Sequence, residues 1–216
     1  MTVTVRLQLT FIFVYTRASM SKLNLRQRNR LEAKRRLQDV ALTLFEERGF
    51  DNVTMQDVAQ EGEVSESTLY RYFGTKESLV VWDEYELDSE IGRRLFKKQP
   101  PAAAFRDALI TAFATQGSLA TLLRRVRFLY ATPQVHAAAV EQEFEDRDEL
   151  AQAFAMVRGS KERSLEDDVL AGACMAALDA AMNHWQSSNG ELNLSSLLEQ
   201  AFATCFPAIP PVSISS

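Results

Sequence analysis

Hydrogen-bonding side chains are concentrated in one short stretch of the chain, Ser65–Tyr72, whose sequence is SESTLYRY. Its hydroxyl, carboxylate, phenol and guanidinium groups can both donate and accept hydrogen bonds. The two histidines of the chain, His136 and His184, lie far from this stretch in the sequence. The stretch therefore favours recognition of a polar partner rather than acid–base or metal chemistry.

Two short helices with a tight turn between them are predicted to position these groups. Thr54 is a good N-cap for the first helix, and Asp57 three residues later can complete a capping box. Ser65 can cap the second helix. An apolar residue before each cap can pack against one inside the helix as a hydrophobic staple. These pairs are Val53 with Val58 and Val64 with Leu69.

The second helix has an apolar inner face and a polar outer face. Leu69 and Phe73 are four residues apart, which places them on one side of the helix, suited to packing inward. The outer face then presents Glu66, Ser67, Tyr70 and Arg71. A short helix of this kind, held against a preceding helix, is typical of a helix-turn-helix reader of DNA.

Charge is distributed unevenly along the chain. Residues 22–36 contain seven Lys or Arg and one Glu, whereas the whole chain has a net charge of −5. A basic segment in an acidic protein indicates a polyanionic partner for that segment, although a solvated helix face would produce the same pattern.

The remaining composition predicts a cytoplasmic protein that is not an enzyme. Cys174 and Cys205 lie in unlike contexts, so neither a disulfide framework nor a zinc spacing is indicated, and a reducing cytoplasm fits. No stretch approaches the roughly 20 apolar residues of a membrane span. Neither a nucleophile elbow nor a phosphate-binding Gly-rich loop is present. We expect no catalytic residue, no metal and no cofactor.

Helical periodicity predicts an all-α fold with about nine helices. A three-helix DNA-binding domain, called the head below, is expected at 25–76, and a helical ligand-binding and dimerisation bundle at 77–206. The helices outside the Val53–Phe73 pair are predicted over Asn29–Gly49, Lys76–Lys98, Ala102–Gln116, 119–130, Pro133–Arg158, Leu165–Ser187 and Leu194–Phe206. Within Pro133–Arg158, Val140, Phe144, Leu150 and Phe154 are expected to point inward.

Both ends of the chain are predicted to lie outside the fold. Residues 1–24 are interpreted as an N-terminal extension, with Met20 as the natural initiator. The apolar run Leu9–Tyr15 lacks the flanking features of a signal peptide. The Pro- and Ser-rich residues 207–216 are expected to be a frayed tail.

The ordered motifs of the head resemble those of TetR-family transcriptional regulators. They are LFEERGFDNVT, DVA, VS and STLYRYFGTKESL, and the likeness extends over about residues 25–206. The segment Val126–Asp146, VRFLYATPQVHAAAVEQEFED, is similar to the C-terminal domain of regulators related to the mycofactocin regulator.

The turn between the two short helices departs from the family pattern. The family usually places Ala-Gly before the Val-Ser of the turn, where this chain has Gly62-Glu63. The glycine that tolerates positive φ is thus one position earlier, so we expect a slightly shifted turn. Because Glu63 adds a negative charge, we also expect weaker or more salt-sensitive DNA binding.

The resemblance implies a dimeric repressor that binds a palindromic double-stranded DNA operator with Ser65–Phe73 in the major groove. Base contacts are expected early on the recognition helix, from Glu66, Ser67 and Thr68. Phosphate contacts are expected from Tyr70, Tyr72, Thr54 and Lys76. Arg28 and Ser65 complete the predicted DNA-binding set.

The homodimer is predicted to form through Leu165–Ser187 and Leu194–Phe206, as a four-helix interface between two subunits. The first of these helices is rich in Ala and Gly, which permit close approach, and the second carries an apolar stripe. An intramolecular core is the alternative interpretation of the same pattern.

A small effector of apolar or acyl type is predicted to bind inside the bundle and to release the operator by linkage. The predicted lining is Phe105, Leu109, Phe113, Arg125, Phe128, Phe144, Met175 and Met182. For each apolar residue, ordinary core packing is the alternative. Polar groups that could orient a ligand are Arg125, Tyr130, His136, His184 and Trp185.

A second functional class stays open at this point. The Gly62-Glu63 pair and the acidic total charge are also compatible with an all-α ligand- or protein-binding module that has lost DNA binding.

Overall fold

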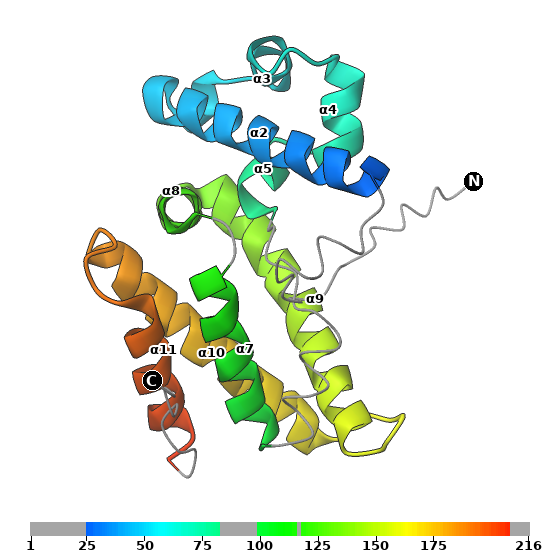
Figure 1. Ribbon diagram of the computed structural model, residues 1–216, viewed down its shortest axis with the longest axis vertical. Coiled ribbons are helices and arrows are strands. Elements are labelled where there is room, and N and C mark those ends of the chain that lie inside the picture. Colours follow the sequence, from blue (N-terminus) through cyan, green and yellow to red (C-terminus); the bar gives the residue numbers. More distant parts are fainter. Residues whose placement is uncertain (1–24, 83–98, 116–117, 208–216) are drawn as a thin grey trace.

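The computed structural model describes residues 25–82, 99–115 and 118–207, and these contain helices but no strand (Figure 1). The helices of the first range are α2 (Leu25–Arg48), the 3₁₀ helix η1 (Phe50–Asn52), α3 (Met55–Glu61), α4 (Glu66–Phe73) and α5 (Ser78–Val81). Those of the other two ranges are α7 (Pro101–Thr115), α8 (Leu119–Ala131), α9 (Pro133–Val157), α10 (Leu165–Ser187) and α11 (Leu194–Cys205). The all-α class is confirmed.

The head is built around α2, which runs below α3 and past the lower end of α4 in Figure 1. Leu37, Ala41 and Phe45 of α2 lie at helical spacing and are buried. They share one core cluster with residues of η1, α3, α4 and α5. Gly49 ends α2 with a φ of +84°, a backbone conformation that favours glycine.

The prediction of one helix from Lys76 to Lys98 is wrong for the first turns of that range. The helix begins only at Ser78 and ends at Val81, because Trp82 has a ψ of 126°. Residues 83–98 lie outside the described part of the chain. The last carbonyls of α5 accept hydrogen bonds from side chains of other helices instead of continuing their own helix.

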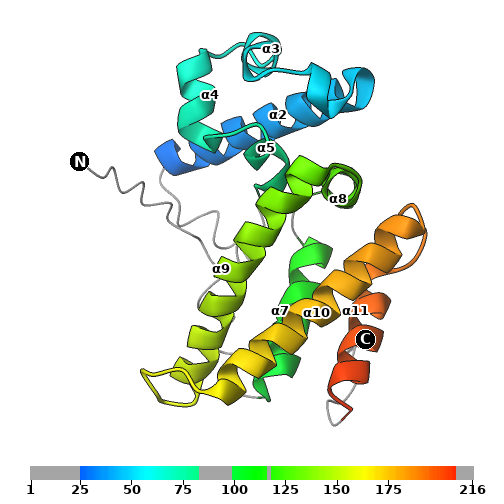
Figure 2. The same ribbon diagram turned by 180° about the vertical axis from the view of Figure 1, so that it is seen from behind.

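The bundle packs α7, α8, α9, α10 and α11 around a second core cluster. Figures 1 and 2 show α7, α10 and α11 side by side, with α9 running from the head to the far end of the molecule. Phe105, Phe154 and Phe202 are each at most 2% exposed at the centre of this cluster. No described helix is long and apolar enough to cross a membrane.

The inward orientation predicted for α9 holds only in its second half. Leu150 and Phe154 are buried, but Val140 is 36% and Phe144 54% exposed. The guanidinium of Arg147 lies 4.7 Å from the Phe144 ring centroid, so a cation–π contact takes the place of core packing. The prediction for Val140 and Phe144 is therefore corrected.

Candidate nucleic-acid interface

The two helix starts of the reader are capped as predicted. Thr54 Oγ1 accepts from the Asp57 backbone N–H at 3.1 Å, and the Thr54 N–H donates to Asp57 Oδ2 at 2.7 Å. This reciprocal box fixes the first turn of α3, and the hydrogen bonds from Thr54 lower the pKa of Asp57. Ser65 Oγ accepts from the Thr68 N–H at 3.2 Å and caps α4 without a reciprocal bond.

In the turn between α3 and α4, the residue with positive φ is at position 63 and not at position 62, so the predicted shift of the turn does not occur. Glu63 itself has a φ of +51°, whereas Gly62 has an ordinary φ of −78°. Glycine is needed at Gly62 for space, because a Cβ there would lie 2.5 Å from Leu37 Cδ2 and 2.9 Å from the Val58 carbonyl oxygen. Arg36 Nη1 also donates to the Gly62 carbonyl at 2.8 Å, which ties the turn to α2.

The inner face of α4 is anchored as predicted. Leu69 is fully buried and Phe73 is 7% exposed, both in the core cluster of the head. The outer face is left open, and Glu66, Ser67, Tyr70 and Arg71 are exposed. The anchoring pair therefore fixes the rotation of α4 and decides which side chains a partner can meet.

Three hydroxyl groups form one cluster at the start of α4. Ser65 Oγ lies 3.1 Å from Ser67 Oγ and 2.8 Å from Thr68 Oγ1. Arg71 Nη2 donates to Thr68 Oγ1 at 3.4 Å. The hydroxyls are thus held in fixed positions and keep lone pairs that a partner can use.

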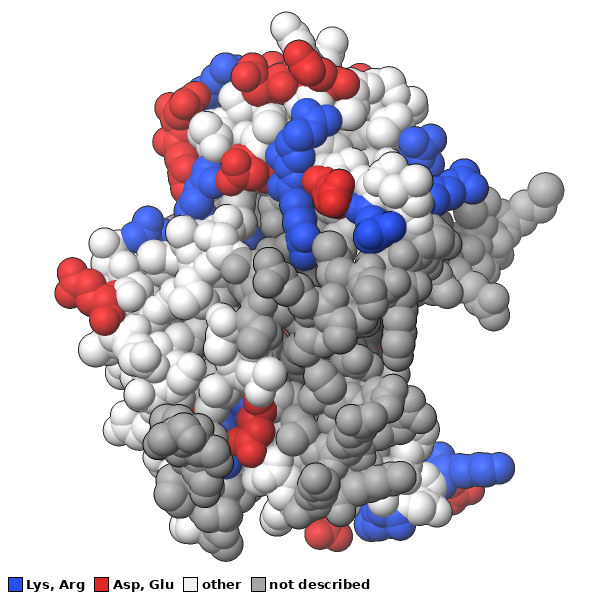
Figure 3. Space-filling model, in the orientation of Figure 1, with Lys and Arg blue, Asp and Glu red and all other residues white. Residues whose placement is uncertain are grey.

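The N-terminal end of α2 lies beside the C-terminal end of α4. The guanidinium groups of Arg30 and Arg71 lie 5.7 Å and 5.6 Å from the Tyr72 ring centroid. Arg28 is exposed on the same part of α2. Lys and Arg side chains lie along α2, while Asp and Glu gather over α3 (Figure 3). The structure therefore brings the predicted residues Arg28 and Tyr72 to one basic end of the head, together with Arg30 and Arg71, which were outside the predicted set.

Lys76 is engaged inside the head. Its ammonium donates to the Phe50 carbonyl at 2.8 Å and to the Val53 carbonyl at 3.1 Å, and it lies 4.2 Å from the Phe50 ring centroid. Two of its three donors are thereby used to hold η1 against the segment that follows α4. Its predicted phosphate contact stays a prediction.

The predicted ligand-lining residues do not converge on one site. Phe105, Leu109, Phe113 and Met175 are buried in the core cluster of the bundle, and Met182 packs against it half-buried. Arg125 instead donates to the Val80 and Val81 carbonyls of α5, at 2.9 Å and 3.0 Å. Phe128 packs against the head, with its ring 5.9 Å from that of Phe45. Phe144 is exposed. The prediction that Arg125, Phe128 and Phe144 line one cavity inside the bundle is therefore corrected.

The head and the bundle meet at a junction that the sequence did not reveal. Arg124 of α8 donates from Nε to Glu46 at 2.7 Å, from Nη1 to Asp39 at 2.5 Å and from Nη2 to Thr43 at 2.8 Å, all on α2. These hydrogen bonds raise the pKa of Arg124, and the bond to Glu46 has the largest effect. The partners are about 80 residues away in sequence, so no local sequence pattern predicts these contacts.

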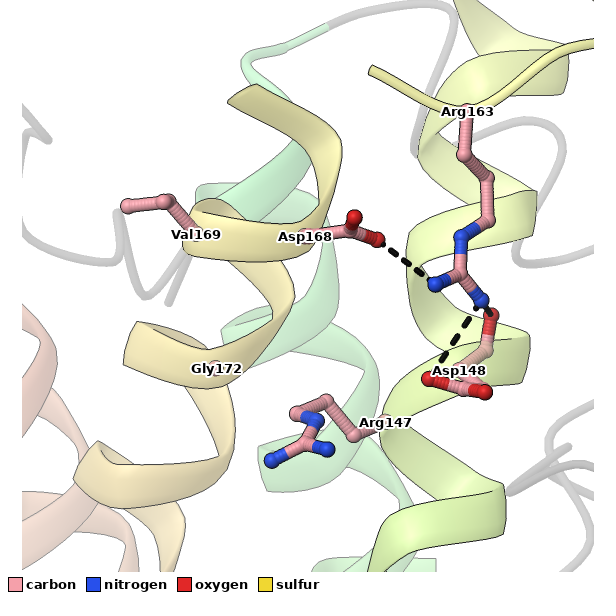
Figure 4. Close-up of a pocket in the computed structure, with 6 residues that line it drawn as sticks. All are labelled: Arg147, Asp148, Arg163, Asp168, Val169 and Gly172. Atoms are coloured by element: carbon pink, nitrogen blue, oxygen red, sulfur yellow. Dashed lines mark hydrogen bonds and ion pairs between the residues drawn. The ribbon is translucent and has the colours of Figure 1, made fainter. Parts of the chain in front are cut away.

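A hollow of about 330 Å³ is lined by residues of α9, of α10 and of the loop that joins them (Figure 4). Arg163 spans it, with ion pairs of 3.3 Å to Asp148 and 2.9 Å to Asp168. None of the predicted ligand residues lines it. Within the described residues no cluster of His, Cys, Asp or Glu could hold a metal ion.

Comparison with known proteins identifies both parts of the chain. Residues 37–81 match the family described as bacterial regulatory proteins, tetR family, and residues 99–210 match the MftR C-terminal domain. A Mycobacterium tuberculosis protein that carries the name of a mycofactocin biosynthesis transcriptional regulator, MftR, is 25% identical over 180 residues. That match covers 81% of this chain and 90% of the relative. The HTH-type transcriptional regulator BetI of Brucella suis is 30% identical over 104 residues, which are 48% of this chain and 52% of that protein.

Solved structures show a more distant likeness. Thermus thermophilus FadR in complex with lauroyl-CoA has a TM-score of 0.45 and 18% identity, over 85% of this chain and 98% of that one. Bacillus subtilis FadR in complex with stearoyl-CoA has a TM-score of 0.48 and 14% identity, over 81% and 98%. At these values neither neighbour indicates a ligand for this chain. The two family matches, which together span the head and the bundle, show that the chain belongs to the TetR family of transcriptional regulators, with a C-terminal domain of the MftR type.

Proposed function

We propose that this regulator is a dimeric, ligand-responsive repressor that binds a palindromic operator through Ser65–Phe73 in the major groove. One observation carries the proposal. Leu69 and Phe73 anchor α4 in the head core, and this leaves its polar outer face exposed beside the basic start of α2. A helix held in this way can enter a groove while neighbouring cations meet the phosphates.

The phosphate contacts are proposed for side chains around the edge of this face. The side chains of Arg28 and Tyr70 are exposed, and neither side chain makes a hydrogen bond within the described chain. Tyr72 is half-buried between two guanidinium groups. Thr54 is exposed at the start of α3. Lys76 keeps one donor for a phosphate after its two internal hydrogen bonds.

The homodimer is proposed to form through α10 and α11. Leu194, Leu198 and Phe202 of α11 are buried in their own subunit, so they are not available to a partner. What remains on α10 is a face of small or apolar residues, among them the exposed Val169, Ala176 and Ala180. Small side chains permit two α10 helices to approach closely, and the two heads could then read half-sites one DNA turn or more apart.

The effector is proposed to be a small apolar or acyl-type molecule that enters the bundle cluster. Phe105, Leu109, Phe113, Met175 and Met182 would meet its chain, because they supply the aromatic and flexible apolar surface of that cluster. A ligand that binds better when the heads are wrongly spaced lowers the DNA affinity by its differential affinity for the two states.

Gel retardation with the DNA upstream of the protein's own gene tests the proposal. We expect specific retardation that weakens with salt, and for Arg28→Ala a shallower salt dependence, by about one phosphate contact. Lys161→Ala is the matched control, because this exposed lysine lies in the α9–α10 loop, at the far end of the bundle. Equal salt slopes for the two variants would remove Arg28 from the interface.

A binding module without DNA affinity is the second candidate, and Glu63 favours it, since this carboxylate sits in the turn that leads into α4. Absence of retardation even at low salt would support this candidate and overturn the repressor.

A further inference from the structure

Glu66 is the one acidic side chain on the outer face of α4, and it is exposed. Within the described chain its carboxylate makes no hydrogen bond or ion pair. The hydroxyls of Ser65, Ser67 and Thr68 beside it are bonded to one another. Glu66 is therefore the group in the first turn of α4 whose hydrogen-bonding capacity is wholly unused.

A carboxylate close to DNA is costly unless it meets a hydrogen-bond donor. It repels phosphates, and two further exposed carboxylates nearby, Glu61 and Glu63, reinforce the repulsion. An ionised carboxylate can only accept hydrogen bonds. In the major groove, guanine presents two acceptors, and thymine presents an acceptor and a methyl group. Adenine presents a donor beside the N7 acceptor, whereas cytosine presents its N4 amino donor without an acceptor of its own.

We propose that Glu66 is a specificity-determining residue that selects cytosine at one position of each operator half-site, by accepting a hydrogen bond from the N4 amino group. The inference rests on the proposed function, because it needs α4 in the major groove. It goes further by naming the base.

A purely structural role is the competing explanation. Glu66 is the first residue of α4, where a negative charge interacts favourably with the helix dipole. That role predicts a loss of thermal stability on substitution, but no change in the preferred bases. The two explanations therefore differ in a measurable way.

Selection from a library of randomised duplex DNA, followed by binding to single-base variants of the selected site, separates them. We expect the wild type to prefer cytosine at one symmetric position by about tenfold. Glu66→Gln should move the preference at that position to adenine, since glutamine can pair with adenine N6 and N7. Glu66→Ala should bind all four bases there equally. Glu61→Gln, a charge-matched control on α3, should change the affinity for all sites by one common factor.

The outcomes also separate this inference from the proposed function. A wild type that selects no specific site overturns both. A wild type with a specific site whose base profile is unchanged in Glu66→Gln and Glu66→Ala overturns the assignment of Glu66 alone. Lower thermal stability of these variants with an unchanged profile would establish the structural role instead.

Discussion

Hydrogen bonds of short and of long sequence range stabilise the helices of the head and the bundle. In the head, Thr54 with Asp57, Ser65 with Thr68 and Thr75 with Ser78 are caps between residues three apart. In the bundle, the Tyr130 hydroxyl donates to Asp179 and Arg127 donates to Asn189, so residues 49 and 62 positions apart are joined. Each region also uses the other kind of bond, since Lys76 donates to the Phe50 and Val53 carbonyls in the head, and Ser164 and Asp167 form a local capping box at the start of α10. The difference is in the sites that were predicted: local caps set the starts of α3 and α4, whereas the side chains of α8 meet partners that only the assembled helices bring near.

The junction between the two regions follows the pattern of the bundle. Gln38 donates to the Leu79 and Trp82 carbonyls, and Arg125 donates to those of Val80 and Val81. Both side chains are at least 92% buried, since their exposed fractions are 3% and 8%. The end of α5 is therefore held by one group from the head and one from the bundle. If the head moves relative to the bundle, these hydrogen bonds must either break or move together with α5.

Arg125→Ala should have the largest effect on stability, because it leaves two carbonyls without their partner at the junction. We expect a loss of about 3 kcal/mol, from roughly 1–3 kcal/mol for each buried group left unsatisfied. Urea unfolding measures it. Arg127→Ala is the matched control on the same helix, and its exposed side chain should cost less than about 1 kcal/mol. Equal losses for both variants would show that the junction contacts do not hold the regions together.

Gly62→Ala and Glu63→Gly should change the stability of the head in opposite directions. The first adds a Cβ against Leu37 and the Val58 carbonyl, and overpacking of this kind costs about 2 kcal/mol. The second relieves a non-glycine residue at positive φ and should stabilise by about 1 kcal/mol. Thermal unfolding measures both. A stabilising Gly62→Ala would mean that the turn is looser than its packing against Leu37 indicates.

Thr54→Ala and Ser164→Ala compare the same capping box in the two regions. Thr54→Ala should cost about 1 kcal/mol. Ser164→Ala should cost about half as much, because Asp167 of that box keeps its ion pair with Arg158. Urea midpoints of the two variants make the comparison, and a larger loss for Ser164→Ala would contradict it.

Glu149→Gln should produce the smallest effect and only above acidic pH. Burial, with help from Asp146 and Glu145, raises the pKa of Glu149 from 4.5 to about 7. The folded state therefore favours the protonated carboxyl, and the stability it supplies is lost as the pH rises from about 4.5 to about 7. After allowance for solvent screening, Glu149→Gln should be more stable than the wild type by under about 1 kcal/mol at pH 8.

The same variant should match the wild type at pH 4, where Glu149 is protonated in both states. Thermal unfolding at the two pH values tests this. A difference of equal size at both would assign the effect to packing rather than to charge.

Most of the head was predictable from its sequence. The end of α2 at Gly49, the caps at Thr54 and Ser65, and the inward pair Leu69 and Phe73 were all expected and confirmed. Each of these features depends on residues within four positions of one another, so sequence spacing contains the necessary information. The set of outer residues on α4 follows from the same spacing.

The bundle was predictable in its helices but not in its functional side chains. The bounds of α10 match the prediction, and those of α11 differ by one residue. The separation of Arg125, Phe128 and Phe144 from a common cavity was not expected. Helical periodicity says which residues share a face, but it does not say which neighbouring helix that face will meet.

By itself the sequence determined an all-α regulator with a capped reading helix, because capping and helical spacing act over a few residues. The tertiary structure alone decided that α5 ends at Val81, that Arg125 belongs to the junction and that Glu63 bears the positive φ. The first two depend on side chains more than 40 positions away in the chain. The third is a backbone conformation that the glycine pattern of the turn did not predict, since the packing of Gly62 against Leu37 requires glycine there for space and not for a positive φ.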